Sequence, residues 1–219
     1  MYQYKQRVSY SQIGPNGSLT IPALVNYFQD CSLFHSQDCV LSLEELLIRK
    51  RAWLLNSWHI IINRLPLMGD EVTISTWPYD FNKMFGHRNM TLTDSSDNTL
   101  CYADSLWFYY DHEAGRPIRP APEEIDGYGL GEPLNMKTVP RRIVYPNQMQ
   151  LVDTLLVTRS FLDTNNHVNN GEYVRVAWGY LPIDFPVNEL RVEYRQAAVL
   201  DDTFAVSTAK VDHSFFITL

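Results

Sequence analysis

The chain has 219 residues, a formal net charge of -7 and a hydrophobic content of 45%. A chain of this length and composition can bury one large core or two smaller ones, which excludes a disordered protein. The acidic balance argues against a general affinity for nucleic acid or for anionic membranes, because both require clustered Lys and Arg side chains.

The N-terminal residues 1–10 alternate between polar and apolar types and lack the continuous apolar region of a signal peptide. No apolar run approaches the roughly 20 residues that a membrane span requires. The three cysteines form no CxxC pair, which fits a reducing compartment. We therefore expect a cytoplasmic protein that binds neither nucleic acid nor membrane.

The first long element is a predicted helix over residues 23–36. Leu24, Phe28 and Cys31 follow helical spacing there, and apolar residues also fill the other faces. Pro22 suits a first helical turn. The pattern predicts a helix that is buried nearly all round.

Strands follow this helix. Residues 57–77 form two alternating runs around a short acidic turn, and residues 86–111 continue as a hairpin through the turn sequence SSDN. Six of the twelve prolines then fall between residues 117 and 146, together with an acidic, Gly-rich run. That stretch is typical of an irregular linker. We therefore divide the chain into a domain at 1–115, a linker at 116–148 and a domain at 149–219.

The second half repeats the first. Setting Asp70 against Asp202 aligns two alternating strands in each half, and setting Asn26 against Asn170 aligns the predicted helices. The second half ends with the counterpart of only one arm of the hairpin. We expect it to be one strand short, with a sheet edge that is exposed or covered by a neighbouring chain or loop.

A long apolar helix wrapped by a curved antiparallel sheet is the hotdog arrangement. The expected fold class is therefore α+β, with two tandem hotdog domains. Periodicity alone leaves open an unrelated α+β domain with accidental internal similarity.

The segment FLDTNNHVNN is the most informative, because it crowds six polar residues between a predicted strand and a predicted helix. The first turn of a helix offers unpaired backbone N–H groups to an acyl oxygen. Asp163 or His167 could take a proton from water, and Asn165 could orient either partner. The alternative is structural: Asp163 and Asn165 cap the helix, Asn169 and Asn170 satisfy nearby backbone, and His167 fills a polar pocket. Six such residues exceed what one cap requires.

Two motifs resemble those of the acyl-acyl-carrier-protein thioesterases. One is D-x-N-x-H-V-N-N at residues 163–170. The other lies in residues 53–77 and is carried by Trp53, Arg64, Pro66, Gly69, Asp70, Thr76 and Trp77. The resemblance spans nearly the whole chain.

The resemblance implies hydrolysis of the thioester that joins a fatty acyl chain to the phosphopantetheine arm of acyl carrier protein, as in fatty acid biosynthesis. No metal and no organic cofactor is implied. Asp163, Asn165 and His167 take the catalytic positions, while Asn169 and Asn170 contact the substrate. The sequence departs from the family at Ala197, where the family often has a carboxylate.

Two further sets of residues complete the prediction. Leu24, Phe28 and Cys31 are expected to line the acyl channel. Acyl carrier proteins are acidic, so docking requires a local basic patch, for which the candidates are two runs: Arg49, Lys50 and Arg51, or Arg141 and Arg142. Both runs could equally be solvated surface charge.

Three competing functions remain open from the sequence. The same fold could hydrolyse acyl-CoA or dehydrate a hydroxyacyl chain, since dehydratases also use His with an acidic residue. A catalytically impaired acyl-carrier-binding protein is the third, and the missing carboxylate at Ala197 favours it. The sequence is compatible with a monomer or a homodimer.

Overall fold

A computed structural model describes residues 1–39 and 41–219. The first half contains β1 (Tyr2–Arg7), α1 (Ile21–Asp38), α2 (Leu43–Ile48), β2 (Arg51–Ile62), β3 (Glu71–Asn82), β4 (Phe85–Asp94) and β5 (Thr99–Asp111). The connecting segment carries β6 (Arg116–Pro117) and α3 (Pro122–Ile125). The second half contains β7 (Gln150–Leu156), α4 (Asn170–Gly179), β8 (Glu189–Glu193), β9 (Thr203–Val211) and β10 (Ser214–Thr218).

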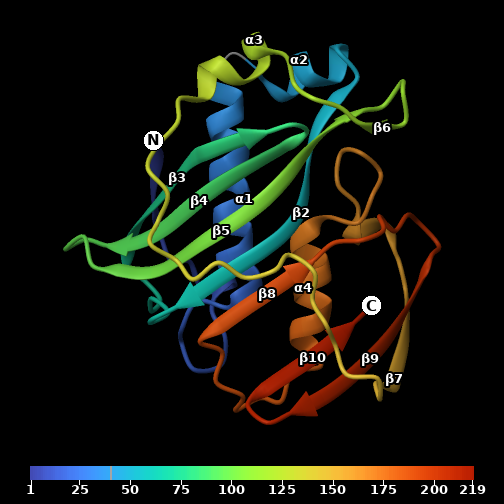
Figure 1. Cartoon of the computed structure of the whole chain (residues 1–219). Helices are drawn as coiled ribbons and strands as arrows, with labels where there is room; N and C mark the ends of the chain where they lie inside the picture. Colours follow the sequence, from blue (N-terminus) through green and yellow to red (C-terminus); the bar gives the residue numbers. More distant parts are fainter. Residues whose placement is uncertain (40) are drawn as a thin grey trace.

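The strands form two antiparallel sheets. The larger one has the order β1-β3-β4-β5-β2-β8, with β6 paired to β5, and the smaller one has the order β10-β9-β7. The α+β class expected from the sequence is confirmed. β8 comes from the second half but pairs with β2 of the first, so the large sheet joins the two halves (Figure 1).

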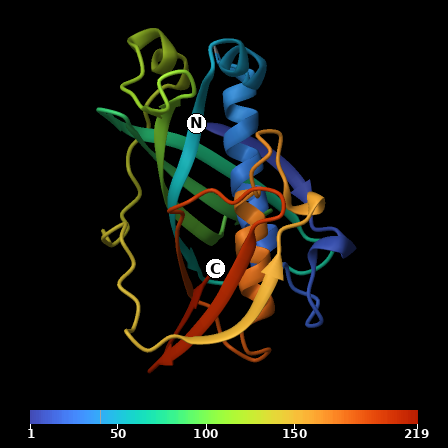
Figure 2. The same cartoon turned by 90° about the vertical axis from the view of Figure 1, so that its right-hand side faces the viewer.

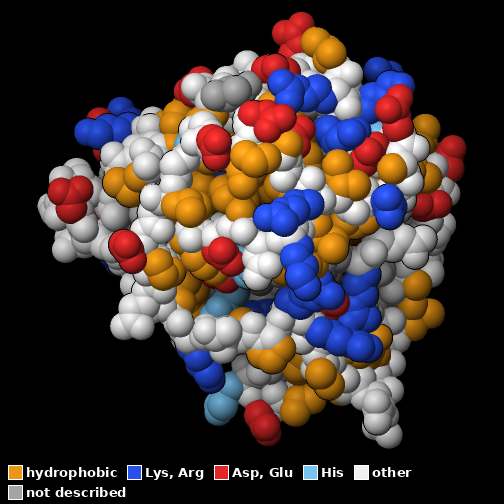
Figure 3. Space-filling view, turned by 45° about the horizontal axis from the view of Figure 1, so that its top comes forward, with side chains coloured by type: hydrophobic (Ala, Val, Ile, Leu, Met, Phe, Trp, Pro, Cys, Tyr) orange, Lys and Arg blue, Asp and Glu red, His pale blue; other side chains and the backbone are white. Residues whose placement is uncertain are grey.

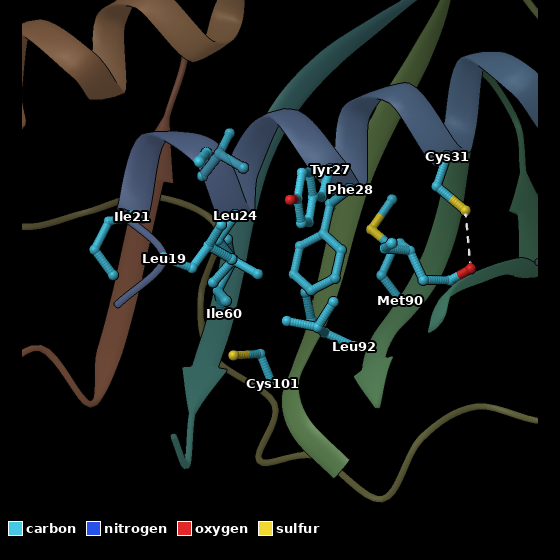
Figure 4. Close-up of a cluster of buried hydrophobic side chains, with 14 of the residues drawn as sticks. Leu19, Ile21, Leu24, Tyr27, Phe28, Cys31, Ile60, Met90, Leu92 and Cys101 are labelled. Atoms are coloured by element: carbon cyan, nitrogen blue, oxygen red, sulfur yellow. Dashed lines mark hydrogen bonds between the residues drawn. The ribbon is translucent and has the colours of Figure 1, made fainter. Parts of the chain in front are cut away.

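The helix α1 lies against the inner face of the large sheet. The side chain of Thr20 caps it by accepting from the backbone N–H of Ala23 at 3.3 Å, and Pro22 stands in its first turn. Leu24, Phe28 and Cys31 are fully buried in the core that the helix shares with the sheet (Figure 4). The predicted buried helix is confirmed, and it begins two residues earlier than expected.

The helix α4 lies in the segment where the sequence predicted the second helix. It begins at Asn170, because the side chain of Asn169 caps it by accepting from the backbone N–H of Gly171 at 2.8 Å. A Cβ added to Gly171 would lie 2.1 Å from Oδ1 of Asn26 on α1, so a larger residue at 171 would require the side chain of Asn26 to move. The alignment of Asn26 with Asn170 is therefore wrong: the two caps, Thr20 and Asn169, are the matching positions.

The alignment of Asp70 with Asp202 is confirmed by identical bonding. Each aspartate accepts through its side chain from the backbone N–H three residues earlier, at 2.9 Å for Leu67 and 2.8 Å for Val199. The backbone carbonyl oxygen of Asp70 accepts from the N–H of Val8, directly after β1. That of Asp202 accepts from the N–H of Val157, directly after β7.

The second half has a gap in its strand order. In the first half β5 lies between β4 and β2, whereas within the described residues no strand lies between β10 and β8. Each of these two strands therefore has one unpaired edge, as the comparison of the two halves led us to expect.

The connecting segment crosses the outer face of the large sheet, opposite the two helices (Figure 2). It is fixed along its length by the backbone N–H groups of Gly131, Leu134 and Ile143, which donate to strand residues of the sheet. The predicted irregular linker thus lies on the sheet and also contains the short elements β6 and α3. No helix of the described residues is long and apolar enough to cross a membrane.

Candidate functional site

The polar residues of the second half lie on one tight turn directly before α4, which we call the polar turn (residues 163–167). Leu162 and Val168 pair as an antiparallel bridge on either side of it. The backbone N–H of Asp163 donates to the carbonyl oxygen of His167 at 2.8 Å and closes the turn. Asn166 has a φ of 58°, a left-handed conformation that asparagine tolerates well.

The carboxylate of Asp163 holds this turn together. Its Oδ1 accepts from the backbone N–H groups of Asn165 at 2.8 Å and His167 at 3.3 Å, an arrangement that favours Asp at a turn. The three predicted catalytic residues therefore lie within one turn. Asp163 and His167 are half-buried, while Asn165 is exposed. Within the described chain, the imidazole of His167 forms no hydrogen bond with the Asp163 carboxylate.

The first half has a turn with the same backbone. Ile13 and Leu19 form the bridge, the N–H of Gly14 donates to the carbonyl oxygen of Ser18 at 2.9 Å, and Gly17 has a φ of 74°. Gly14 and Ser18 therefore occupy the positions of Asp163 and His167. The backbone of the turn belongs to both halves, whereas the carboxylate and the imidazole belong only to the second.

The two asparagines after the turn have structural partners. Besides capping α4, Oδ1 of Asn169 accepts from Nε2 of Gln29 on α1 at 3.3 Å. The carbonyl oxygen of Asn170 accepts from the hydroxyl of Tyr194 at 3.0 Å. The interpretation that Asp163 and Asn165 cap the helix is wrong, because Asn169 does so.

A hollow of about 290 Å³ lies where the two helices meet, next to the polar turn. Its lining from α1 is polar and consists of Asn26, Gln29 and Asp30. Among the described residues, the buried Oε1 of Gln29 has no hydrogen-bond partner. Burial raises the pKa of Asp30. Sequence reasoning missed these residues, since the helix pattern alone gave no sign of which polar positions face α4.

The backbone around Ala198 supports the polar turn from the other side. The carbonyl oxygen of Ala198 accepts from the N–H of Val168 at 2.9 Å, and its N–H donates to the hydroxyl of Tyr173 at 2.8 Å. Burial raises the pKa of Tyr173, and the charges of Asp202 and Asp163 raise it further. Ala197, where the family often has a carboxylate, therefore lies directly beside the support of the turn.

The predicted acyl-channel residues are not brought to the polar turn. Leu24, Phe28 and Cys31 are each 0% exposed and form part of the first-half core (Figure 4). They do not line the hollow between the two helices. Burial raises the pKa of the Cys31 thiol to about 12, which makes the thiolate scarce at neutral pH.

The two predicted basic patches differ in their surroundings. Arg49, Lys50 and Arg51 each form an ion pair, with shortest distances of 2.9, 2.6 and 2.9 Å to carboxylates of the same region. Arg141 and Arg142 are exposed and belong to the connecting segment, which crosses the outer face of the large sheet, whereas α4 lies on the inner face (Figure 2).

Similar proteins share the sequence pattern and the fold. The chain is 24% identical to the palmitoyl-acyl carrier protein thioesterase of Arabidopsis thaliana over 90% of its own length and 52% of that relative. It is 26% identical to oleoyl-acyl carrier protein thioesterase 2 of the same plant over 92% and 61%. The chain thus spans little more than half the length of these curated relatives, both of which are named as chloroplastic proteins.

Two solved structures have the same fold. An acyl-ACP thioesterase from Bacteroides thetaiotaomicron superposes with a TM-score of 0.88 at 23% identity, covering 98% of this chain and 89% of the other. The 12:0-ACP thioesterase from Umbellularia californica superposes with a TM-score of 0.83 at 20% identity, covering 96% and 88%. The helix wrapped by an antiparallel sheet is thus the hotdog fold expected from the sequence.

Family profiles match both halves of the chain. The acyl-ACP thioesterase N-terminal domain matches residues 1–128, and the C-terminal domain of the same family matches residues 146–216. Together they cover both motifs on which the resemblance was based. The chain belongs to the acyl-ACP thioesterase family.

Proposed function

We propose that this protein hydrolyses the thioester of fatty acyl-acyl carrier protein and releases a free fatty acid and the carrier. The observation that carries the proposal is the polar turn. Asp163, Asn165 and His167 stand on a turn at the start of α4. The matching turn of the first half keeps an asparagine, Asn16, at the position of Asn165 but has Gly14 and Ser18 in place of Asp163 and His167. A feature present in one of two similar halves is what a single active site would require.

The bonding of the turn favours different roles for its residues. Asp163 uses Oδ1 to accept two backbone N–H groups, so we assign it to hold the turn. His167 is the better general base, since within the described residues no hydrogen bond occupies its ring. The base takes a proton from water, whose oxygen attacks the acyl carbon. The carbon–sulfur bond then breaks, and the proton goes to the departing thiol of the phosphopantetheine arm.

The start of α4 can stabilise the negative charge that develops on the acyl oxygen. The backbone N–H groups of Val168, Asn169, Gly171 and Glu172 already have hydrogen-bond acceptors within the protein. The N–H of Asn170 therefore remains as the first-turn donor that we assign to the oxyanion. One such donor contributes about 2.7 to 4 kcal/mol to transition-state stabilisation in other hydrolases.

The remaining assignments extend this proposal. We infer that the two halves are tandem hotdog units, that the core around Leu24, Phe28 and Cys31 opens to take the acyl tail, and that one of the two basic patches receives the carrier. The carboxylates that pair with the Arg49–Arg51 run weaken its electrostatic attraction for an acidic carrier. Among the described residues, Arg141 and Arg142 form no ion pair, yet they belong to the connecting segment, which crosses the face of the large sheet opposite α4 (Figure 2). A cytoplasmic location remains a prediction from the sequence.

The test compares carrier-bound and CoA-bound substrates. Purified protein is incubated with a panel of acyl-acyl carrier proteins and acyl-CoA thioesters, and free thiol and fatty acid are measured. We expect hydrolysis of the carrier-bound series that is lost in His167→Ala. Turnover of the CoA series alone would identify an acyl-CoA thioesterase instead. Binding of acyl carrier protein without any turnover would contradict the proposal and favour a carrier-binding protein.

A further inference from the structure

A second hollow lies on the outer face of the large sheet, away from the polar turn. Residues 133–141 of the connecting segment form its roof, and outward-facing side chains of the sheet form its floor. Its volume is about 540 Å³, within the range of about 300 to 1,000 Å³ that is typical of small-molecule sites. Figure 3 shows a hollow on this side of the molecule, with histidine visible inside it and Lys and Arg side chains gathered beside it.

The floor is a continuous polar row across the sheet. Strand pairing sets Asn89 of β4 opposite Asp104 of β5, Asp104 opposite His59 of β2, and His59 opposite Arg191 of β8. Asn89 and His59 are only 2% and 7% exposed. Buried polar side chains in the middle of a sheet face carry a desolvation cost, so they point to a specific use.

Hydrogen bonds fix the groups of this floor. The hydroxyl of Tyr79 donates to Oδ1 of Asp104 at 2.9 Å and lies 3.2 Å from Nδ1 of His87. His59 is 2.9 Å from the carboxylate of Glu189. Because these side chains position one another, a ligand that binds here would not have to order them first.

The charge of the lining is positive, although the protein as a whole is acidic. Lys137, Arg141 and Arg191 all line the hollow, and in the part of the chain that the structure describes none of them forms an ion pair with a carboxylate. Arg141 lies over the ring of Phe85 at 5.7 Å, and Arg191 donates to a backbone carbonyl oxygen. Among the described residues that line the hollow, Asp104 is the one carboxylate, and Glu189 pairs with the lining residue His59 from outside it, so the three cations exceed these two anions by one charge.

We propose that this hollow binds an organic phosphate monoester. A phosphate monoester carries a charge of about -1.5 to -2 at pH 7 and is attracted by this excess of positive charge. Guanidinium and ammonium groups are the usual donors to phosphate oxygens. The hollow is larger than a phosphate ion, and the apolar side chains of Leu134, Met136 and Val139 in its roof can cover the organic part. A nucleotide and free phosphopantetheine share this chemistry. Arg141 belongs both to this hollow and to one of the two candidate docking patches for the carrier, but binding of a free monoester requires no thioester hydrolysis at the polar turn.

Calorimetric titration of the whole protein tests the proposal. The probes are 5′-AMP and 4′-phosphopantetheine, each compared with its unphosphorylated parent, adenosine or pantetheine. We expect at least one phosphate monoester to bind and its parent not to bind, and the one that binds identifies the source. Arg191→Met and Lys137→Met should each weaken binding about tenfold, as expected for the loss of one charge-assisted contact.

The neighbouring residue Arg142 provides a matched control, since it is exposed, carries the same charge and does not line the hollow. Arg142→Met should leave the affinity within about twofold of the wild type, because rim charges outside a site contribute little to affinity. Circular dichroism of each variant checks that the fold is retained. The proposal is overturned if neither monoester binds at about 1 mM, a concentration that detects even weak affinity. It is also overturned if the parents bind equally well, or if Arg142→Met weakens binding as much as Arg191→Met.

Discussion

The carbonyl oxygen of Ala198 accepts a hydrogen bond from the backbone N–H of Val168 at 2.9 Å. This bond ties the start of α4 to the segment after β8 and brings the exposed Ala197 next to the polar turn. We expect a carboxylate at residue 197 to lie close enough to His167 to stabilise the protonated ring.

We predict that Ala197→Glu increases kcat for acyl-acyl carrier protein about tenfold, which is less than the roughly 10² to 10⁴ of a full general acid-base contribution. Steady-state kinetics measure the effect. Gln196→Glu adds the same charge one residue away and should leave kcat unchanged. Equal effects of the two variants would show that only the net charge had mattered.

Gly171 is the residue through which α4 approaches α1. Gly171→Ala should lower the free energy of unfolding by about 1 kcal/mol, because the side chain of Asn26, whose Oδ1 would lie 2.1 Å from the added Cβ, must move away. Gly179→Ala in the same helix meets nothing within 4 Å and should be neutral or stabilising. Urea denaturation distinguishes the two. Equal stability of both variants would mean that Gly171 and Asn26 are not closely packed.

Phe28 is the largest of the predicted acyl-channel residues and is fully buried. Phe28→Ala should cost about 3 to 5 kcal/mol of stability. If the core opens to take the acyl tail, the space left by the ring should also shift the preference toward longer chains. Phe34→Ala is the control, since Phe34 is 45% exposed. An unaltered product profile from a folded Phe28→Ala protein would remove this residue from the acyl channel.

His35 gives the stability of the protein a defined pH dependence. Burial and the neighbouring Arg88 guanidinium, whose Nη1 lies 2.8 Å from Nδ1 of His35, lower the pKa of this histidine from 6.5 to about 4. The unfolded chain therefore binds the proton more readily than the folded chain. Stability should be fully present above about pH 6.5 and should fall as the pH drops toward 4.

Denaturant unfolding at several pH values measures this slope. His35→Gln keeps an acceptor for Arg88 but cannot titrate, so it should flatten the fall between pH 6.5 and 4. His213→Gln changes an exposed histidine and should leave the slope unchanged. An identical slope in wild type and His35→Gln would contradict the assignment.

The basic run at the end of α2 offers a test of carrier docking. Charge reversal in Arg49→Glu with Lys50→Glu should raise KM for acyl-acyl carrier protein while leaving kcat unchanged, if this run meets the acidic carrier. Because both side chains are exposed, their ion pairs contribute little to stability, and the fold should be retained. An unchanged KM would exclude the run as a docking surface.

The sequence predicted those features that rest on local patterns. Strand alternation was enough to match Asp70 with Asp202, and the polar turn was visible because its residues are adjacent in the chain. The helix register was wrong, since Asn26 and Asn170 look alike although they have different places relative to the caps Thr20 and Asn169. The pairing of strands from different halves could not be predicted from the sequence either. The polar row from Asn89 to Arg191 joins four strands, so no local pattern could reveal it.

The rate of acyl-acyl carrier protein hydrolysis in His167→Ala, compared with Ser18→Ala, decides whether the polar turn is the active site. The two residues hold the same position in two turns of the same backbone, but only one turn carries a carboxylate and an imidazole. We predict that kcat falls by roughly 10² to 10⁴ in His167→Ala and stays at the wild-type value in Ser18→Ala. Wild-type turnover in a folded His167→Ala protein would show that His167 is not the general base.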